Sequence, residues 1–242
     1  MTDGVYELPL KLCLRDVDMN RKLRVSRLFE YLQEISIAQT EDMGMGRSKT
    51  LDRGFLWVLT RQHAKIERMP EYDERVVLRS WPGRTMHVLF PRYYTVSAEN
   101  GEPLIAASSY WTLMSEKTRT LAMPEEHGVV IEETKLPAPI ELPRVQKPLP
   151  ETERFSFTVP YSFTDFNGHM NNTRYFDIVQ DHIPDVAAGH ALRYVSAEYS
   201  SEVRFGETMT VSLGNAGNAW SAVGEREKHL FRVYFDYETA KP

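Results

Sequence analysis

The sequence predicts an α+β protein in which two antiparallel sheets each wrap around a long helix and join into one continuous sheet. Two observations lead to this prediction. The order of one strand, one helix and several strands occurs twice along the 242 residues, and a proline-rich stretch separates the two occurrences. An Asp-x-Asn sequence also precedes the helix in both halves, beginning at Asp18 and at Asp165.

The first half begins with an expected strand over residues 5–14, where leucines alternate with other residues as one buried face requires. Residues 25–42 place apolar side chains at helical spacing and Gly44 follows as a terminator, so we expect an amphipathic helix there. Four segments rich in β-branched and aromatic residues then predict an antiparallel meander: 55–66, 75–81, 87–98 and 104–115.

The middle of the chain predicts a linker. Residues 121–150 contain six prolines, which preclude a continuous helix or a central strand. We therefore expect an N-terminal domain over residues 1–120, a linker over 121–150 and a C-terminal domain over 151–242. In the last of these, Asn171 or Asn172 is expected to cap the helix, and strands are expected at residues 155–163, 194–205, 208–213, 219–224 and 230–237.

A comparison of the two halves indicates a duplication. Moving the chain by 147 residues (165 minus 18) superposes the two Asp-x-Asn sequences and places Lys22 over His169. A second offset of 137 residues (202 minus 65) places Lys65 over Glu202. Only the second half therefore has a histidine at this place, which favours loss of function in the first copy.

Packing considerations determine how two such units combine. Each half has an apolar helix stripe and an apolar sheet face that must be buried against each other. Pairing the sheet edges of the two halves removes edges that would otherwise be exposed. The result is the arrangement called a double hotdog, which is distinct from a nucleotide-binding fold because the chain has no glycine-rich phosphate loop.

Composition excludes several classes of function. A net charge of −5 and a pI of about 5.9 argue against nucleic acid as a partner, and no apolar stretch approaches the length of a membrane span. The single cysteine, Cys13, cannot form an internal disulfide and is expected to be a small buried apolar residue. With no signal sequence at the start, we expect a cytoplasmic protein.

The candidate site is the turn over residues 164–172, which leads directly into the second helix. An Asp, an Asn and a His crowd together there, and such groups can polarise a carbonyl and hold an attacking water. This set is typical of a hydrolase. The seven histidines are scattered without the spacing of a zinc site, so we expect neither a metal nor a cofactor.

Across nearly its whole length the chain resembles the acyl-acyl carrier protein thioesterases of plants and bacteria. The resemblance rests on Asp-x-Asn-x-His-x-Asn-Asn at residues 165–172, followed by Tyr175, and on first-half segments at residues 57–61, 111–114, 118–119 and 124–126. It also implies a catalytic glutamate some thirty residues beyond the histidine, at Glu202. The cysteine that plant members often carry after this glutamate is replaced by Val203, which excludes a thiol nucleophile.

The resemblance implies hydrolysis of fatty acyl-acyl carrier protein to a free fatty acid. Asp165, Asn167, His169 and Glu202 are the expected catalytic residues, with water as the nucleophile and either Glu202 or His169 as the general base. Candidates for substrate binding are Phe29, Leu32, Trp57 and Asn171, and for contacts with the acidic carrier protein Arg84, Arg92, Arg193 and Arg204. A homodimer is left open.

Three alternatives to this function are open at the level of sequence. The first is an acyl-CoA thioesterase on the same scaffold, and the second is an acyl-binding module without catalysis. The third is a hydratase, although the His/Asp arrangement of hydratases is not apparent. A module that only binds has no reason to keep both His169 and Glu202, which favours an enzyme.

Overall fold

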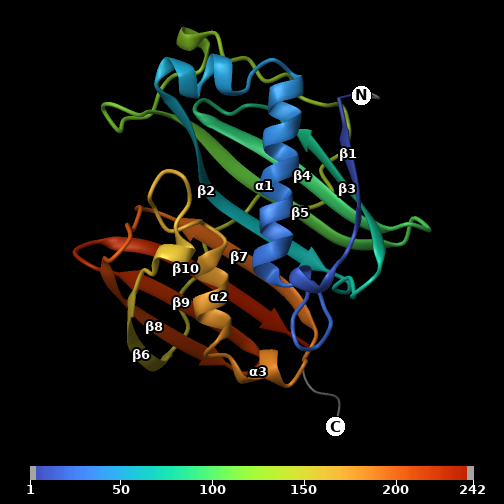
Figure 1. The fold of residues 1–242 in the computed structure, drawn as a ribbon, viewed down its shortest axis with the longest axis vertical. Coiled ribbons are helices and arrows are strands. Elements are labelled where there is room, and N and C mark those ends of the chain that lie inside the picture. The colour runs from blue at the N-terminus through green and yellow to red at the C-terminus, as the bar shows by residue number, and fades with distance from the viewer. Residues whose placement is uncertain (1–3, 239–242) are drawn as a thin grey trace.

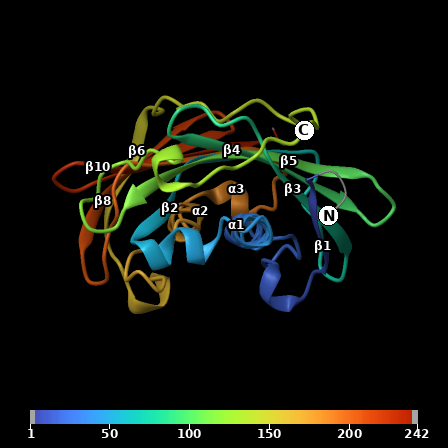
Figure 2. The same cartoon turned by 90° about the horizontal axis from the view of Figure 1, so that it is seen from above.

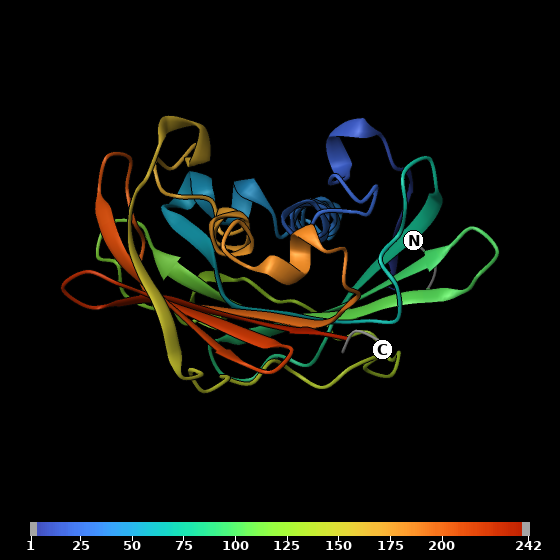
Figure 3. The ribbon, with the colours of Figure 1, turned by 90° about the horizontal axis from the view of Figure 1, so that it is seen from below.

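The computed structural model describes residues 4–238 and contains one antiparallel sheet of ten strands. The strands lie in the order β1-β3-β4-β5-β2-β7-β10-β9-β8-β6, so each half of the chain forms one half of the sheet. The sheet curves around the helices, which all lie on its concave face (Figures 1 and 3). The expected double hotdog arrangement is confirmed.

The strands of the first half follow the expected segments closely, but their pairing is not that of a simple meander. Strand β1 pairs with β3, and β2 pairs with β5, so that only β3, β4 and β5 are consecutive neighbours. The long helix α1, Val25–Asp42, crosses this half of the sheet. The strands are β1 (Tyr6–Lys11), β2 (Phe55–Ile66), β3 (Arg75–Pro82), β4 (Leu89–Ala98) and β5 (Pro103–Ser115).

The second half repeats this order with a shorter helix. Helix α2 covers Arg174–Gln180, and a separate turn of helix, α3, covers Pro184–Ala187. Pro184 explains the interruption, because it holds Ile183 in an extended conformation that ends a helix. The strands are β6 (Glu151–Thr158), β7 (Leu192–Tyr199), β8 (Thr208–Ala216), β9 (Ala219–Glu225) and β10 (His229–Tyr237).

The start of α2 differs from the expected cap. The N-cap position is Thr173, and no side chain caps the helix there. Asn171 instead accepts hydrogen bonds from the backbone N–H of Thr173 at 2.9 Å and from its hydroxyl at 2.8 Å. The expectation that Asn171 or Asn172 caps the helix is therefore wrong, because Asn171 stabilises the turn that precedes it.

The two halves meet along one strand pair and one helix pair. Strands β2 and β7 pair antiparallel at the centre of the sheet. On the concave face, the rings of Phe29 in α1 and Phe176 in α2 stack with centroids 4.7 Å apart, and both side chains are fully buried. The core is therefore continuous across the two halves.

The linker runs along the opposite, convex face of the sheet (Figure 2). The carbonyl of Glu141 lies 2.7 Å from Nε2 of His63, a buried side chain on β2, and the backbone N–H of Leu149 donates to Ser221 on β9 at 2.8 Å. Burial lowers the pKa of His63, which keeps the imidazole neutral under this segment. The linker is thus attached to strands of both halves.

The expectation for Cys13 is wrong. Its side chain is exposed, and its thiol donates a hydrogen bond of 2.9 Å to Asp16, which is fully buried. Asp16 also accepts from the Tyr31 hydroxyl at 2.8 Å and from Nη2 of Arg27 at 3.0 Å. Cys13 is therefore a hydrogen-bond donor beside α1 rather than a packing residue.

Candidate active site

The turn that begins at Asp165 is held by the side chain of Asp165 itself. Its Oδ1 atom accepts hydrogen bonds from the backbone N–H groups of Asn167, at 2.8 Å, and of His169, at 3.4 Å. The backbone N–H of Asp165 donates to the carbonyl of His169 at 2.9 Å and closes the loop. Gly168 has a φ of +75°, a left-handed conformation that suits glycine. Asp165 thus shapes the loop that presents His169.

His169 and Glu202 meet where this loop joins the segment after β7. The backbone N–H of Met170 donates to the carbonyl of Val203 at 2.7 Å, which ties the two segments together. Nε2 of His169 lies 3.2 Å from Oε2 of Glu202. The imidazole side chain is 11% exposed and the carboxylate side chain 44%, so the pair lies at the protein surface with the imidazole on its inner side. Such a pair is able to accept a proton from water.

A third residue, which the sequence analysis did not select for the site, contacts this pair. Arg119 follows β5 in the first half, and its Nη1 and Nη2 atoms lie 3.2 Å and 3.1 Å from the two carboxylate oxygens of Glu202. The only signal in the sequence was that Arg119 falls within one of the segments that match the family. Nothing near Arg119 in the sequence indicated a contact with Glu202.

Asn167 and Asp165 lie on the same turn without reaching Glu202. The side-chain amide of Asn167 is 3.5 Å from Oδ2 of Asp165, and Asn167 is exposed. Among the residues that the structure describes, neither side chain has a hydrogen bond to Glu202. The fold therefore brings His169 and Glu202 into contact and leaves Asp165 and Asn167 beside them.

The hydroxyl group of Tyr175, in the first turn of α2, belongs to the same neighbourhood. Tyr175 is only 3% exposed. Burial raises its pKa, and the negative charges of Glu202 and Asp165 raise it further. The hydroxyl therefore stays protonated at neutral pH, so it can donate a hydrogen bond but not act as a base.

The non-catalytic turn of the first half allows a direct structural comparison. The backbone N–H of Leu23 donates to the carbonyl of Pro70, as that of Met170 donates to Val203. The residue preceding each of these carbonyls is therefore equivalent, which places Met69 opposite Glu202. The offset that matched Lys65 with Glu202 is wrong, because the segments between strand and turn differ in length.

Two family models match this chain, and together they cover most of it. The model described as acyl-ACP thioesterase N-terminal domain matches residues 4–129, and the one described as acyl-ACP thioesterase C-terminal domain matches residues 146–237. The chain belongs to the acyl-ACP thioesterase family. The resemblance found in the sequence is thereby confirmed.

Among curated members of the acyl-ACP thioesterase family, the palmitoyl-acyl carrier protein thioesterase of Cuphea hookeriana is 26% identical over 90% of this chain. The dodecanoyl-[acyl-carrier-protein] hydrolase of Cinnamomum camphora is 24% identical over the same share. Both are described as chloroplastic. This chain spans 56% and 61% of the lengths of these two relatives.

Solved structures of acyl-ACP thioesterases share the fold. An acyl-ACP thioesterase from Bacteroides thetaiotaomicron superposes with a TM-score of 0.90 at 23% identity, over 98% of this chain and 100% of the other. The 12:0-ACP thioesterase from Umbellularia californica superposes with a TM-score of 0.84 at 20% identity, over 98% of each chain. The double hotdog arrangement is therefore that of this family.

The four candidates for substrate binding are not gathered in one place. Phe29 and Leu32 lie in the main core and are at most 2% exposed. Trp57 packs against a separate small cluster that includes Leu113, and Asn171 holds the turn before α2. Their role in binding substrate stays a prediction.

The four arginines considered for carrier contacts also differ. Arg92 is buried, and its guanidinium donates to Gln39, Ser80 and Thr40, so it is not available to a partner. Arg204 is exposed and lies two residues after Glu202. Of the arginines considered, Arg204 is thus the one beside the catalytic pair in sequence.

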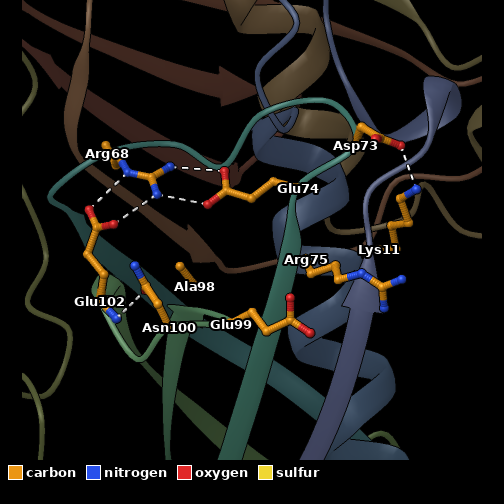
Figure 4. Close-up of a pocket in the computed structure, with 9 residues that line it drawn as sticks. All are labelled: Lys11, Arg68, Asp73, Glu74, Arg75, Ala98, Glu99, Asn100 and Glu102. Atoms are coloured by element: carbon orange, nitrogen blue, oxygen red, sulfur yellow. Dashed lines mark hydrogen bonds and ion pairs between the residues drawn. The ribbon is translucent and has the colours of Figure 1, made fainter.

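Two hollows lie away from the His169–Glu202 pair. An open hollow of about 590 Å³ at the outer end of the first half is polar, and its charges neutralise one another, since Arg68 pairs with both Glu74 and Glu102 (Figure 4). A second hollow of about 460 Å³ borders the first-half turn and includes Lys22 and Met69. Neither one contains the acid and base groups of the second-half turn.

Two further properties concern residues 4–238. Within them, no group of three or more His, Cys, Asp or Glu side chains is arranged to hold a metal ion. No helix in this part of the chain combines the length and the apolar character that crossing a membrane requires.

Proposed function

We propose that this protein hydrolyses the thioester of fatty acyl-acyl carrier protein and releases the free fatty acid. The observation that carries the proposal is the 3.2 Å contact between Nε2 of His169 and Oε2 of Glu202. Membership of the acyl-ACP thioesterase family supports the choice of substrate. The names of the curated relatives point to the same class of reaction in those proteins.

The proposed reaction needs no covalent intermediate with the enzyme. The His169–Glu202 pair accepts a proton from a water molecule while the water oxygen bonds to the carbonyl carbon of the thioester. The tetrahedral intermediate then breaks its carbon–sulfur bond, and the proton passes to the sulfur of the departing thiolate. We assign the side-chain amide of Asn167 to the developing oxyanion, and Asp165 to the shape of the loop.

The proposal also divides the labour between the halves. The C-terminal domain, residues 151–242, carries the catalysis, and the N-terminal domain, residues 1–120, binds the acyl chain, with the linker over 121–150 between them. The support is chemical, because the first-half turn has Lys22 and Met69 where the second has His169 and Glu202. The partner is the acyl carrier protein, with Arg204 as its nearest candidate contact. A cytoplasmic location and a homodimer stay predictions.

Thiol release from a panel of acylated carriers tests the function. Acyl-acyl carrier proteins and acyl-CoAs of matched chain lengths are compared by their kcat/KM values. We expect the carrier protein to be preferred, because only it offers a protein surface for contacts outside the site. If no acyl-acyl carrier protein released thiol, the proposal would be wrong.

Variants of the pair test the site. We expect His169→Ala and Glu202→Ala to lower kcat by about 10²- to 10⁴-fold, the usual contribution of general acid–base groups. The control is Lys22→Ala, which changes the equivalent position of the first half and should keep the parental rate. Folded variants of both His169 and Glu202 with parental rates would refute the assignment.

A further inference from the structure

The guanidinium of Arg119 reaches the catalytic pair from the other half of the molecule. Arg119 lies in the tight turn that follows β5, where its backbone N–H donates to the carbonyl of Ser115 at 2.9 Å. Its two terminal nitrogens lie 3.2 Å and 3.1 Å from the two oxygens of Glu202, which is 83 residues away in the sequence. The first half therefore contributes a cation to a site otherwise built by the second half.

The backbone of Arg119 is not one that an arginine adopts readily. Its φ is +56°, in the left-handed region, where a non-glycine residue costs about 1 kcal/mol or more. The side chains of Arg119 and Glu202 are 39% and 44% exposed, and an exposed ion pair stabilises a fold by about 0–1 kcal/mol. The ion pair does not clearly outweigh the strain, so stability does not account for an arginine here.

The geometry of the contact indicates what Arg119 does instead. Two parallel N–H to oxygen contacts from a planar guanidinium fix the orientation of a carboxylate, which a single contact does not. The carboxylate held in this way places Oε2 at 3.2 Å from Nε2 of His169. The same positive charge keeps a negative charge favourable on Glu202 while it faces the imidazole.

We propose that Arg119 is a positioning residue that holds the Glu202 carboxylate against Nε2 of His169. This inference rests on the proposed function, because it assigns a role within the same reaction. In this arrangement the Nε2–H group of His169 donates to Glu202, which leaves Nδ1 as the nitrogen that accepts the proton of the attacking water. Arg119 itself does not touch the reacting atoms.

Replacement by glycine separates the guanidinium from the backbone strain. Arg119→Gly removes the contact with Glu202 and relieves the left-handed conformation, so its Tm should not fall. We expect kcat to decrease by about 10- to 100-fold, as for loss of groups that orient a reacting partner, with KM changed by less than about twofold. Arg21→Gly is the matched control, because Arg21 also has a left-handed φ, of +61°, at the turn of the first half.

Two measurements distinguish positioning from a structural role. Guanidinium chloride at millimolar concentration should restore part of the kcat of Arg119→Gly, whereas potassium chloride of equal ionic strength should not. The acid limb of the pH profile of kcat/KM should move to higher pH, because the lost cation no longer favours the deprotonated pair. In a Glu202→Ala background, Arg119→Gly should lower the rate no further.

The outcomes separate this inference from the proposed function. A parent protein without thiol release overturns both. An active parent whose Arg119→Gly variant has parental kcat and pH profile overturns only the positioning role. A variant that loses Tm along with rate, and that guanidinium does not rescue, assigns Arg119 to the structure and also overturns the role.

Discussion

The two Asp-x-Asn turns of this protein have the same hydrogen bonds and different chemistry. In the first half, Oδ1 of Asp18 accepts from the backbone N–H groups of Asn20 and Lys22, at 2.8 Å and 3.1 Å. In the second half, Oδ1 of Asp165 accepts from the two equivalent N–H groups at 2.8 Å and 3.4 Å. The Asp-x-Asn pattern is therefore a device for building the turn, whether or not the turn is catalytic.

The difference between the turns lies at two positions. Lys22 occupies the place of His169, and Met69 occupies the place of Glu202. A lysine ammonium has no lone pair with which to accept a proton at neutral pH, and a thioether cannot hold an imidazole by a charged hydrogen bond. Comparison of the copies thus separates the scaffold, which both retain, from the acid–base pair, which only the second has.

The largest effect is expected when the first-half residue is placed in the second half. His169→Lys should keep the turn, because only the backbone of residue 169 takes part in its hydrogen bonds, yet lower kcat by about 10²- to 10⁴-fold. Steady-state thiol release measures it. Lys22→His is the reciprocal control and should add no activity to the first turn, because Met69 offers it no carboxylate. A His169→Lys enzyme within tenfold of the parent would contradict the comparison.

The next effect concerns the contact that the two copies share. Phe29 and Phe176 are equivalent under the offset of 147 residues (176 minus 29), and their rings stack at the junction of α1 and α2. Each change to alanine should lower the free energy of unfolding by about 3–5 kcal/mol, since both side chains are fully buried. Urea denaturation of both single variants and the double variant measures this.

The double variant sharpens that comparison. The two losses should add to more than the loss in the double variant by about 0.5–1.5 kcal/mol, the contribution of a stacked aromatic pair. Strict additivity would mean that the two halves are stabilised separately and that the stack does not join them.

A smaller effect is expected at a position where the copies differ in charge. Asp16 is equivalent to Phe163 (16 plus 147), so only the first half has a buried carboxylate here. Burial alone raises the pKa of Asp16, but hydrogen bonds from Cys13, Tyr31 and Arg27 outweigh it and lower the pKa to about 2. Relative to 3.8, this shift corresponds to about 2 kcal/mol in favour of the folded state at neutral pH.

The sign follows from the lowered pKa. The ionised carboxylate of Asp16 stabilises the fold above about pH 4, and this contribution is lost as the pH falls from about 4 toward 2. Asp16→Asn should therefore be about 2 kcal/mol less stable at pH 7, with a shallower decline in acid than the parent. Urea denaturation between pH 7 and pH 2.5 measures both curves. Parallel curves for the two proteins would show that Asp16 is not the group responsible.

Local patterns in the sequence determined most elements. The helix over residues 25–42 and the strand over residues 55–66 were expected with the bounds that the structure has, because periodicity and turn residues act over short distances. The pairing of β1 with β3 and of β2 with β5 was not, because it depends on contacts between distant segments. Pro184, which interrupts the second helix, was visible in the sequence but was not used.

The candidate site divides in the same way. Asp165, Asn167 and His169 share one turn, so the local sequence was enough to group them. Glu202 came from the resemblance to a family, and Arg119 was missed, because it meets Glu202 only through the fold. Residues contributed by different segments are therefore those that a single sequence conceals.

The smallest effect is expected from exchanging the residues that adopt the left-handed conformation in the two turns. Gly168 has a φ of +75° and its counterpart Arg21 one of +61°, and a Cβ added at Gly168 meets no atom within 4 Å. Gly168→Ala should therefore cost only the backbone strain, about 1 kcal/mol, and Arg21→Gly should gain up to about the same amount. Urea denaturation measures both, and their sum in the double variant should be near zero. If Gly168→Ala lowered kcat far more than stability, the catalytic turn would need a backbone precision that the first turn does not, and the two turns would not be equivalent scaffolds.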